Sequence, residues 1–201
     1  MTALGAVCSN QAPCLGSYSA VTQLLDAIDP CNWYGKRDRA IILLLWDTGA
    51  RAGELCDLEM RDLELERGRV LIRSGKGEKD RYIVVGQRAQ QALAEWLDVR
   101  LRNGKTPPYV FLNRREEPLT RHGLAIMLRR RCQEAEVEGP DNPHAFRHGF
   151  AVAYLDNGGK IHTLQRLMGH ATLRSTEVYL WASDRDALED HAQASPADNL
   201  S

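Results

Sequence analysis

The sequence predicts an α+β fold that is mainly α-helical with one small antiparallel β-sheet. Apolar residues recur at the 3.6-residue period of a helix over most of the chain, and only the span 69–85 changes to short β-branched runs. The chain has 201 residues, 43% of them hydrophobic, which is enough for one compact domain with a buried core. Its longest apolar run, 40–46, is too short for a membrane span of about 20 residues.

Helices are expected before and after this sheet along the sequence. Apolar spacing and stop signals predict helices over 17–29, 36–48, 50–58, 87–102, 120–136, 142–157, 160–168 and 175–181, and a further one over 184–193. Gly49 and Gly169 stand where helices usually end, whereas Asn142 followed by Pro143 is a typical helix start. We therefore divide the chain into a lead-in over 1–16, a folded domain over 17–181 and a C-terminal tail over 182–201.

The sheet is expected to be a hairpin with a basic tip. The β-branched runs 69–73 and 81–85 flank a turn-rich insert, Ser-Gly-Lys-Gly-Glu-Lys-Asp, over 74–80. Glycines on both sides leave Lys76 projecting from the turn, where its ammonium group can reach a phosphodiester. Taken alone, the same pattern describes an ordinary solvated hairpin. A further short extended piece is predicted over 109–112, after Pro107 and Pro108.

Charge is distributed unevenly along a chain whose net charge is only −1. The segment 100–131 holds nine Lys or Arg residues against two Glu, which gives it a net charge of +7. The segment 182–201 holds five acidic residues against one Arg, a net charge of −4. Segregation of this kind can build a local positive field on a nearly neutral chain, although a solvated helix face explains any single cluster.

The five cysteines form neither a CxxC pair nor a regular spacing. Their odd number, in a chain whose first residues do not resemble a secretory signal, favours free thiols in a reducing compartment. Paired cysteines would be needed for a zinc ribbon, so we expect no structural zinc. The sequence thus favours a cytoplasmic location.

The first candidate segment, Thr48-Gly-Ala-Arg51, follows the helix predicted over 36–48. Gly49 ends that helix and Arg51 begins the next, with Glu54 three residues further on. Residues at this spacing share a helix face, so the carboxylate can hold the guanidinium. Taken alone, the segment is also explained as an ordinary capped helix with a surface ion pair.

Two histidines and an arginine occupy the start of the helix that begins at Pro143. His144 and Arg147 lie three residues apart on one face, at a helix end that favours anions, which makes a phosphate site. His148 lies four residues after His144, a spacing that also suits a metal. Position 145 is alanine, however, so the general base of an HExxH metal site is missing. We therefore expect no metal here.

The fourth candidate segment runs from Leu167 to Tyr179 and contains Gly169-His170. On one continuous helix His170 and Tyr179, nine residues apart, would face opposite sides. Gly169 and the stretch 171–175 break the helix, so the two side chains can converge. Tyr179 is otherwise explained as a core residue beside Val178 and Leu180.

Together these segments resemble the catalytic domain of the tyrosine recombinases, or phage-type integrases. The resemblance runs from about Tyr18 to Trp181 and rests on TGxR, the GKG hairpin, HxxRH, and GH followed nine residues later by Tyr, in that order. It implies the tyrosine recombinase catalytic-domain fold. It also implies six catalytic residues and one supporting acid: Arg51, Lys76, His144, Arg147, His170 and the nucleophile Tyr179, with Glu54 in support.

The resemblance implies cleavage of a DNA strand through a 3′-phosphotyrosine. Two arginines stabilise the charge on the phosphate oxygens, Lys76 protonates the leaving oxygen, and one of His144 and His170 accepts the tyrosine proton. The covalent bond conserves the energy of the phosphodiester, so neither ATP nor another cofactor is needed. Further DNA contacts are expected from basic residues of the hairpin and of the positive segment: Lys79, Arg81, Arg114, Arg115, Arg129, Arg130 and Arg131.

Double-stranded DNA is accordingly the expected partner, with the protein a monomer when free, a tetramer on DNA and associated with the nucleoid when bound. The acidic tail 182–201 resembles a family segment that packs on a neighbouring protomer. Family members also carry an N-terminal DNA-binding domain, whereas 16 residues precede the predicted domain here, which fits either a fragment or a minimal form. Two alternatives stay open: relaxation of DNA in the manner of a type IB topoisomerase, and a DNA-binding remnant that does not cut.

Overall fold

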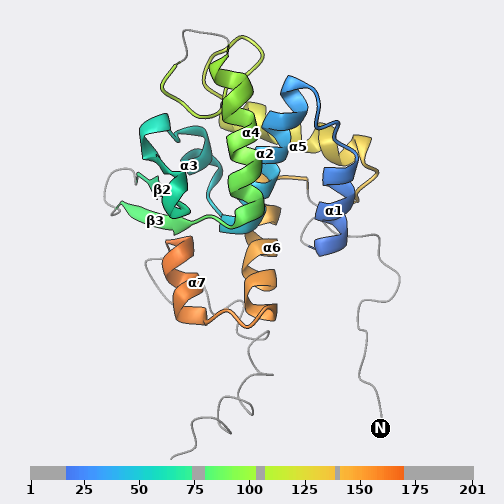
Figure 1. Ribbon diagram of the computed structural model, residues 1–201. Coiled ribbons are helices and arrows are strands. Elements are labelled where there is room, and N and C mark those ends of the chain that lie inside the picture. Colours follow the sequence, from blue (N-terminus) through green and yellow to red (C-terminus); the bar gives the residue numbers. More distant parts are fainter. Residues whose placement is uncertain (1–16, 74–79, 103–106, 139–140, 170–201) are drawn as a thin grey trace, which may run out of the picture.

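The computed structural model describes residues 17–73, 80–102, 107–138 and 141–169. This part of the chain is mainly helical with one small antiparallel sheet, which confirms the predicted fold class (Figure 1). Its seven α-helices are α1 Tyr18–Asp26, α2 Trp33–Thr48, α3 Ala52–Cys56, α4 Gln87–Leu101, α5 Arg121–Glu134, α6 Pro143–Asp156 and α7 Ile161–Met168. The helices predicted over 175–181 and 184–193 lie outside the described residues.

Helix α2 runs through the centre of the molecule, and α4 and α6 pack on it (Figure 1). It begins at Trp33, not at residue 36, because the side chain of Asn32 accepts a hydrogen bond of 2.6 Å from the backbone N–H of Gly35. Its last turn ends at Gly49, which has the left-handed φ of 60°.

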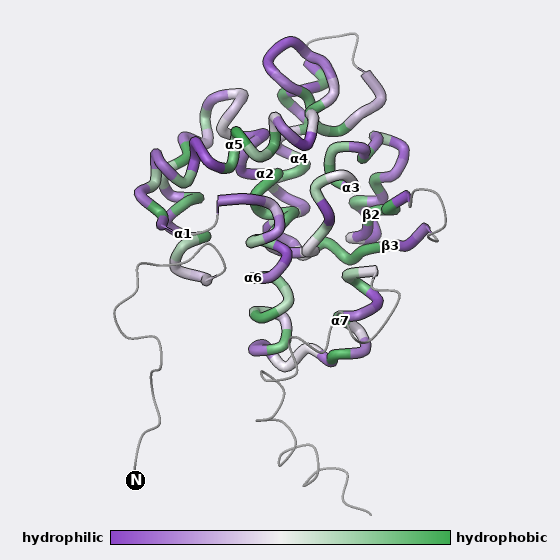
Figure 2. The backbone as a smooth tube through the Cα atoms, turned by 180° about the vertical axis from the view of Figure 1, so that it is seen from behind, coloured by the Kyte–Doolittle hydropathy of each residue, from purple (hydrophilic) through white to green (hydrophobic). Residues whose placement is uncertain are grey.

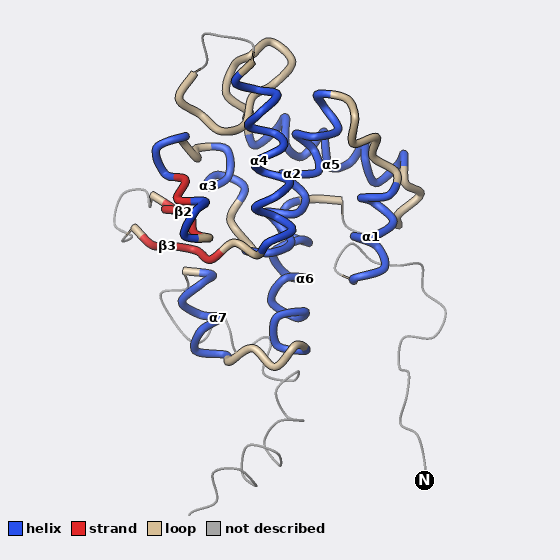
Figure 3. Tube along the Cα trace, viewed as in Figure 1, coloured by secondary structure: helices blue, strands red, loops and turns tan. Residues whose placement is uncertain are grey.

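The sheet has three antiparallel strands in the order β1-β2-β3: β1 Leu63–Glu64, β2 Arg69–Ile72 and β3 Arg81–Val84 (Figure 3). Strands β2 and β3 form the predicted hairpin, with Val70 opposite Ile83 and Ile72 opposite Arg81. Strand β1 was not predicted, because two residues are too few to show an alternating pattern.

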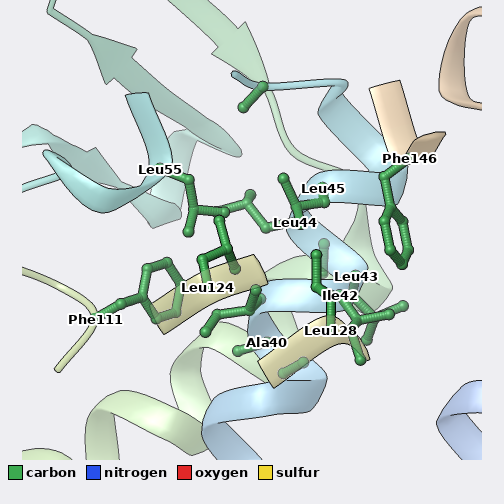
Figure 4. Packing of buried hydrophobic residues seen from close by; sticks show 14 of the residues in the cluster. Ala40, Ile42, Leu43, Leu44, Leu45, Leu55, Phe111, Leu124, Leu128 and Phe146 are labelled. Carbon is green, nitrogen blue, oxygen red and sulfur yellow. The ribbon is translucent and has the colours of Figure 1, made fainter. Parts of the chain in front are cut away.

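The main hydrophobic core joins helices α1 to α5, the sheet and the first turn of α6. Figure 4 shows how side chains of α2 meet Leu55 of α3, Leu124 and Leu128 of α5, and Phe146 of α6. The apolar run that the sequence marked at 40–46 lies at its centre, and its members from Ala40 to Leu45 are all buried.

A second, much smaller cluster holds α6 against α7. It consists of five buried residues: Phe150, Ala151, Leu155, Leu164 and Met168. Figure 2 shows hydrophobic and hydrophilic stretches alternating along α6, as expected of a helix with one buried face. Phe146 and Phe150 stand one turn apart on α6, so this helix contributes to both cores.

Within the described ranges, no helix is long and apolar enough to cross a membrane. Three of the five cysteines fall in those ranges, and all three are free thiols: Cys31 is exposed, whereas Cys56 and Cys132 are buried.

Candidate active site

Arg51 stands at the junction between α2 and α3, directly after the tight turn at Gly49. A Cβ atom at Gly49 would lie 2.4 Å from the ring of Phe150, so both the positive φ and the close approach require glycine. Arg51 is the N-cap residue of α3, and its backbone N–H donates to Glu54 Oε2 at 2.8 Å. Its guanidinium donates to Glu54 Oε1 at 2.9 Å, which confirms the ion pair that the spacing predicted.

Arg147 lies on α6 and is 7% exposed. Its Nη1 donates to the carbonyl of Gly49 and its Nη2 to the carbonyl of Met168, each at 2.6 Å. Both acceptors are neutral carbonyls, so these two bonds orient the guanidinium without cancelling its charge. Arg147 thereby joins the turn that carries Arg51 to the end of α7.

Three arginines meet at the C-terminal end of α7. The carbonyls of residues 167, 168 and 169, which we call the carbonyl trio, each accept one guanidinium N–H. Arg81 Nε donates to the first at 3.1 Å, Arg147 Nη2 to the second at 2.6 Å, and Arg51 Nη2 to the third at 3.0 Å. The last carbonyls of a helix have no partner within the helix and form the negative end of its dipole, so cations are favoured there.

Glu54 connects two of these arginines. Besides Arg51, its carboxylate binds Arg81 in a bidentate pair, with Nη1 to Oε1 at 2.8 Å and Nη2 to Oε2 at 3.0 Å. Burial opposes the negative charge of Glu54, but the hydrogen bonds from Arg81 and Arg51 outweigh it and hold the pKa of this carboxyl below its usual value. Glu54 is therefore ionised at neutral pH and keeps both guanidinium groups in place.

His144 and His148 lie in the first two turns of α6, and both side chains are exposed. The helix start is as the sequence predicted: Asn142 is the N-cap, and its side chain accepts from the backbone N–H groups of His144 and Ala145. Across the described residues, no group of three or more His, Cys, Asp or Glu side chains is arranged to hold a metal ion.

Four predicted site residues, Lys76, Lys79, His170 and Tyr179, lie outside the described residues. The structure thus brings Arg51, Glu54 and Arg147 together around the end of α7. His170 follows directly in the sequence.

The arginines of the positive segment do not form a single surface. Arg100 is 2% exposed, and its Nη2 donates to the carbonyls of Pro107 and Tyr109. Arg131 is paired with the fully buried Asp38 at 2.7 Å. These two guanidinium groups support the core packing, which the sequence count of charges could not reveal.

The remaining candidate DNA contacts differ in their surroundings. Arg114 and Arg115 are exposed on the segment between α4 and α5, and Arg114 lies over the ring of Tyr34 at 5.1 Å. Arg129 pairs with Asp141 at 3.2 Å, and Arg130 lies 3.6 Å from Asp38.

Comparison with known proteins agrees with this arrangement. The family model described as the phage integrase family matches residues 18–185. The chain therefore belongs to the phage integrase family, as the motifs indicated. Among curated proteins, it is 37% identical over 164 residues to the tyrosine recombinase XerC of Lactobacillus leichmannii, an alignment that covers 80% of this chain and 55% of the relative. It is also 37% identical over 163 residues to the tyrosine recombinase XerD of Listeria innocua, covering 79% of this chain and 54% of the relative.

Solved structures show the same fold. The crystal structure of XerA recombinase superposes with a TM-score of 0.77 at 32% identity, covering 93% of this chain and 67% of that one. The XerH site-specific recombinase, in a post-cleavage complex with its palindromic difH substrate, superposes with a TM-score of 0.72 at 25% identity. This match covers 98% of the present chain and 56% of the XerH chain. The chain thus spans about half the length of the curated relatives it matches.

Arg81 has a part in this site that the sequence reasoning missed, because it was counted only among the candidate DNA contacts. The signal was present in the strand pattern. Residues 81 and 83 share one face of β3, and Ile83 on that face is buried. An arginine on the inward face of a strand needs a buried acceptor, and the alternation could have shown that Arg81 points toward the core side.

Proposed function

We propose that the chain is the catalytic domain of a site-specific DNA recombinase, with residues 17–181 as the catalytic unit. In this proposal Tyr179 attacks a DNA phosphodiester, and the strand is later rejoined by the reverse reaction. Arg51, Lys76, His144, Arg147 and His170 assist, and Glu54 supports Arg51. Family membership supports the class of reaction, since the relatives are named tyrosine recombinases.

One observation carries the proposal: Arg51 and Arg147, far apart in the sequence, are held on adjacent carbonyls at the end of α7. A guanidinium presents a planar fork of donors that matches the oxygens of a phosphate. Two such groups side by side can bind the two non-bridging oxygens of one phosphodiester. The position lies next to the point where the chain continues to His170.

These arginines act on the charge of the transition state. As the tyrosine oxygen approaches phosphorus, negative charge accumulates on the equatorial oxygens, and fixed donors stabilise it without reorganising. Loss of one such donor typically slows a reaction by about 10²–10³-fold. Arg147 is buried and held by two hydrogen bonds of 2.6 Å, so it meets the requirement of a fixed donor.

The proton balance assigns the other residues. Only about one tyrosine in a thousand is ionised at pH 7, because its ordinary pKa is about 10. His144 or His170 accepts the proton as the Tyr179 oxygen bonds to phosphorus. The bond from phosphorus to the 5′ oxygen breaks, and Lys76 gives that oxygen a proton. The products are a 3′-phosphotyrosine and a free 5′-hydroxyl, and no ATP or metal enters the balance.

The proposed partner is double-stranded DNA, supported by XerH, which was crystallised bound to its difH substrate. Self-assembly into a tetramer on DNA is part of the same proposal, with the tail 182–201 packing on a neighbouring protomer. Within the cell, this assembly would act at the nucleoid in the cytoplasm. Lys79, Arg114, Arg115, Arg129 and Arg130 stay proposed as further contacts to the DNA backbone, whereas Arg131 is paired with the buried Asp38.

The proposal is tested with nicked duplexes of randomised sequence that carry a label on the strand 5′ of the cleavage point. The nick lets the short 5′-hydroxyl fragment diffuse away, so the covalent intermediate accumulates. We expect a protein–DNA adduct that survives denaturing electrophoresis with the natural chain and is absent with Tyr179→Phe. Arg147→Ala is expected to form it about 10²–10³-fold more slowly.

Three other outcomes would contradict the assigned nucleophile or the proposed function. An adduct that persists in Tyr179→Phe would refute the assigned nucleophile. Relaxation of any supercoiled plasmid, independent of sequence, would favour a topoisomerase-like activity. Salt-sensitive DNA binding with no adduct on any duplex would favour a DNA-binding remnant.

A further inference from the structure

We propose that Arg81 is a positioning residue that fixes the orientation of Arg51 and the end of α7 at the same time. The inference rests on the proposed function, because it concerns how the phosphate-binding arginines are held. Arg81 is the first residue of β3, and it contacts α3 through Glu54 and α7 through the carbonyl of Leu167. A single side chain therefore links three elements that meet at the site.

The contacts of Arg81 account for every nitrogen of its guanidinium. Nη1 and Nη2 bind the two oxygens of Glu54, and Nε binds Leu167 O. The side chain is only 14% exposed. A planar group fixed at three points cannot rotate without breaking several bonds. This geometry suits a residue that connects neighbouring elements, and it leaves little of the side chain exposed for direct contact with DNA.

Glu54 transmits this order to Arg51. Each carboxylate oxygen accepts one bond from Arg81 and one from Arg51: Oε1 receives both Nη1 atoms, and Oε2 receives Arg81 Nη2 and the backbone N–H of Arg51. Without Arg81, two of these four bonds are lost, and only the two bonds from Arg51 hold the carboxylate. The Arg51 side chain, which is 36% exposed, takes its direction from this carboxylate and from the carbonyl of Gly169.

The second link concerns the glycine that ends α7. Gly169 has a φ of 62°, and a Cβ atom there would lie 2.8 Å from Arg81 Cζ. The guanidinium thus packs directly on the backbone that leads to His170. The positive φ and the nearby guanidinium of Arg81 both favour glycine at position 169, and the Arg81 Nε–H donates to the carbonyl of Leu167 in the last turn of α7. Arg81 thereby sets the distance between Arg51 and the end of α7.

One experiment needs no catalysis. Side-chain Nε–Hε NMR signals of the full chain are recorded for the natural protein, Arg81→Gln and Arg69→Gln. Arg69 is a matched control, because it also pairs with a glutamate on the same sheet, Glu64, which touches no residue of the site. We expect Arg81→Gln to shift and broaden the Arg51 signal and Arg69→Gln to leave it unchanged.

A second experiment measures the chemistry. The single-turnover rate of adduct formation at saturating nicked DNA is expected to fall about 10²-fold in Arg81→Gln, since misplacing a reacting group by about 1 Å costs this much. The dissociation constant for DNA should change less than the rate. Added guanidinium ion should partly restore the rate, and Arg69→Gln should react normally. Arg81→Lys, which keeps the charge but not the fork, should be intermediate.

The outcomes separate the two proposals. If the natural chain forms no adduct but Arg81→Gln disturbs the Arg51 signal, the proposed function fails and the positioning role stands. An unchanged Arg51 signal overturns the positioning role whatever the activity. A weaker DNA affinity at an unchanged rate also overturns it, because Arg81 would then contact DNA directly. If Arg81→Gln does not fold, the same readouts on Arg81→Lys decide.

Discussion

The body of the molecule and its α7 end are held together by different forces. In the body, long apolar residues of α2 such as Ile41 and Leu45 are fully buried among the surrounding helices and the sheet. At the other end, five buried residues join α7 to α6. There the last turn of α7 is fixed mainly by arginines that donate to the carbonyl trio.

This difference shows what the arginine contacts add at the α7 end, where the apolar cluster is small. Hydrophobic packing is non-directional and can fix the body, but it cannot aim a guanidinium at a phosphate. Hydrogen bonds to carbonyls can, because they have a preferred geometry. Arg51 and Arg147 therefore do two things in the proposal: they hold the end of α7, and they present charge to DNA.

The largest expected effect comes from two phenylalanines one turn apart on α6. Phe146 is fully buried in the core of the body, so Phe146→Ala should lower the free energy of unfolding by about 3–5 kcal/mol. Phe150 belongs to the small α6–α7 cluster and borders a groove lined also by Tyr18 and Trp46. Water can enter that space, so Phe150→Ala should cost clearly less. Urea unfolding monitored by circular dichroism measures both.

The two residues are matched in type and helix, and both are buried, so the comparison contrasts the two cores. Equal losses would mean that α7 and the body unfold as one unit with one continuous core. A larger loss for Phe150→Ala would contradict the division between body and α7 end.

The sequence predicted the fold of the body well because that fold depends on periodicity. Local patterns mark the run 40–46, the two strands of the hairpin and the helix end at Gly49. The structure confirms all three. The start of α2 was placed three residues too late, because the cap by Asn32 was not recognised. Strand β1 left no pattern at all, since two residues cannot alternate.

The site was predictable only in part. The spacing of Arg51 and Glu54 within one turn indicated their pair, but the partners of Arg81 and Arg131 lie far along the chain. Strand alternation could have shown that Arg81 turns inward, but no local pattern tells that Arg131 turns to a buried carboxylate. The count of positive charge over 100–131 therefore included Arg100, which is buried.

The next largest effect is the loss of the Glu54 contacts at low pH. The pKa of Glu54 is lower in the folded than in the unfolded chain, so its stabilising contribution is complete above the unfolded pKa of about 4.3 and is lost as pH falls through the folded value. Protonation removes the anchor of Arg51 and Arg81. We therefore expect α7 amides to lose hydrogen-exchange protection at acid pH before those of α2. Glu54→Gln should show the same weak protection already at neutral pH.

Asp47, on the last turn of α2, serves as a control because its pKa is shifted in the opposite direction to that of Glu54. Burial raises its pKa, although the N–H of Gly86 donates to it at 2.6 Å. Asp47→Asn should therefore stabilise the protein at neutral pH, and this gain should vanish below the ordinary aspartate pKa of about 3.9. If α2 and α7 lost protection together in acid, Glu54 would not be specific to the α7 end.

The smallest expected effect is on the buried cysteines of the body. Burial raises the pKa of Cys56 to about 12 and that of Cys132 to about 11, so at pH 8 almost no thiolate forms, and neither side chain is accessible. Iodoacetamide should modify the exposed Cys31 and should spare Cys56 and Cys132 until denaturant is added. Peptide mass spectrometry measures the extent of modification at each cysteine. Arg81→Gln should leave the protection of Cys56 unchanged, because Leu55 and Cys56 of α3 pack in the core of the body, whereas Arg81 contacts this helix through Glu54. Faster alkylation of Cys56 in that variant would show that cutting the arginine contacts loosens the core as well, and that the two regions are not independently stabilised.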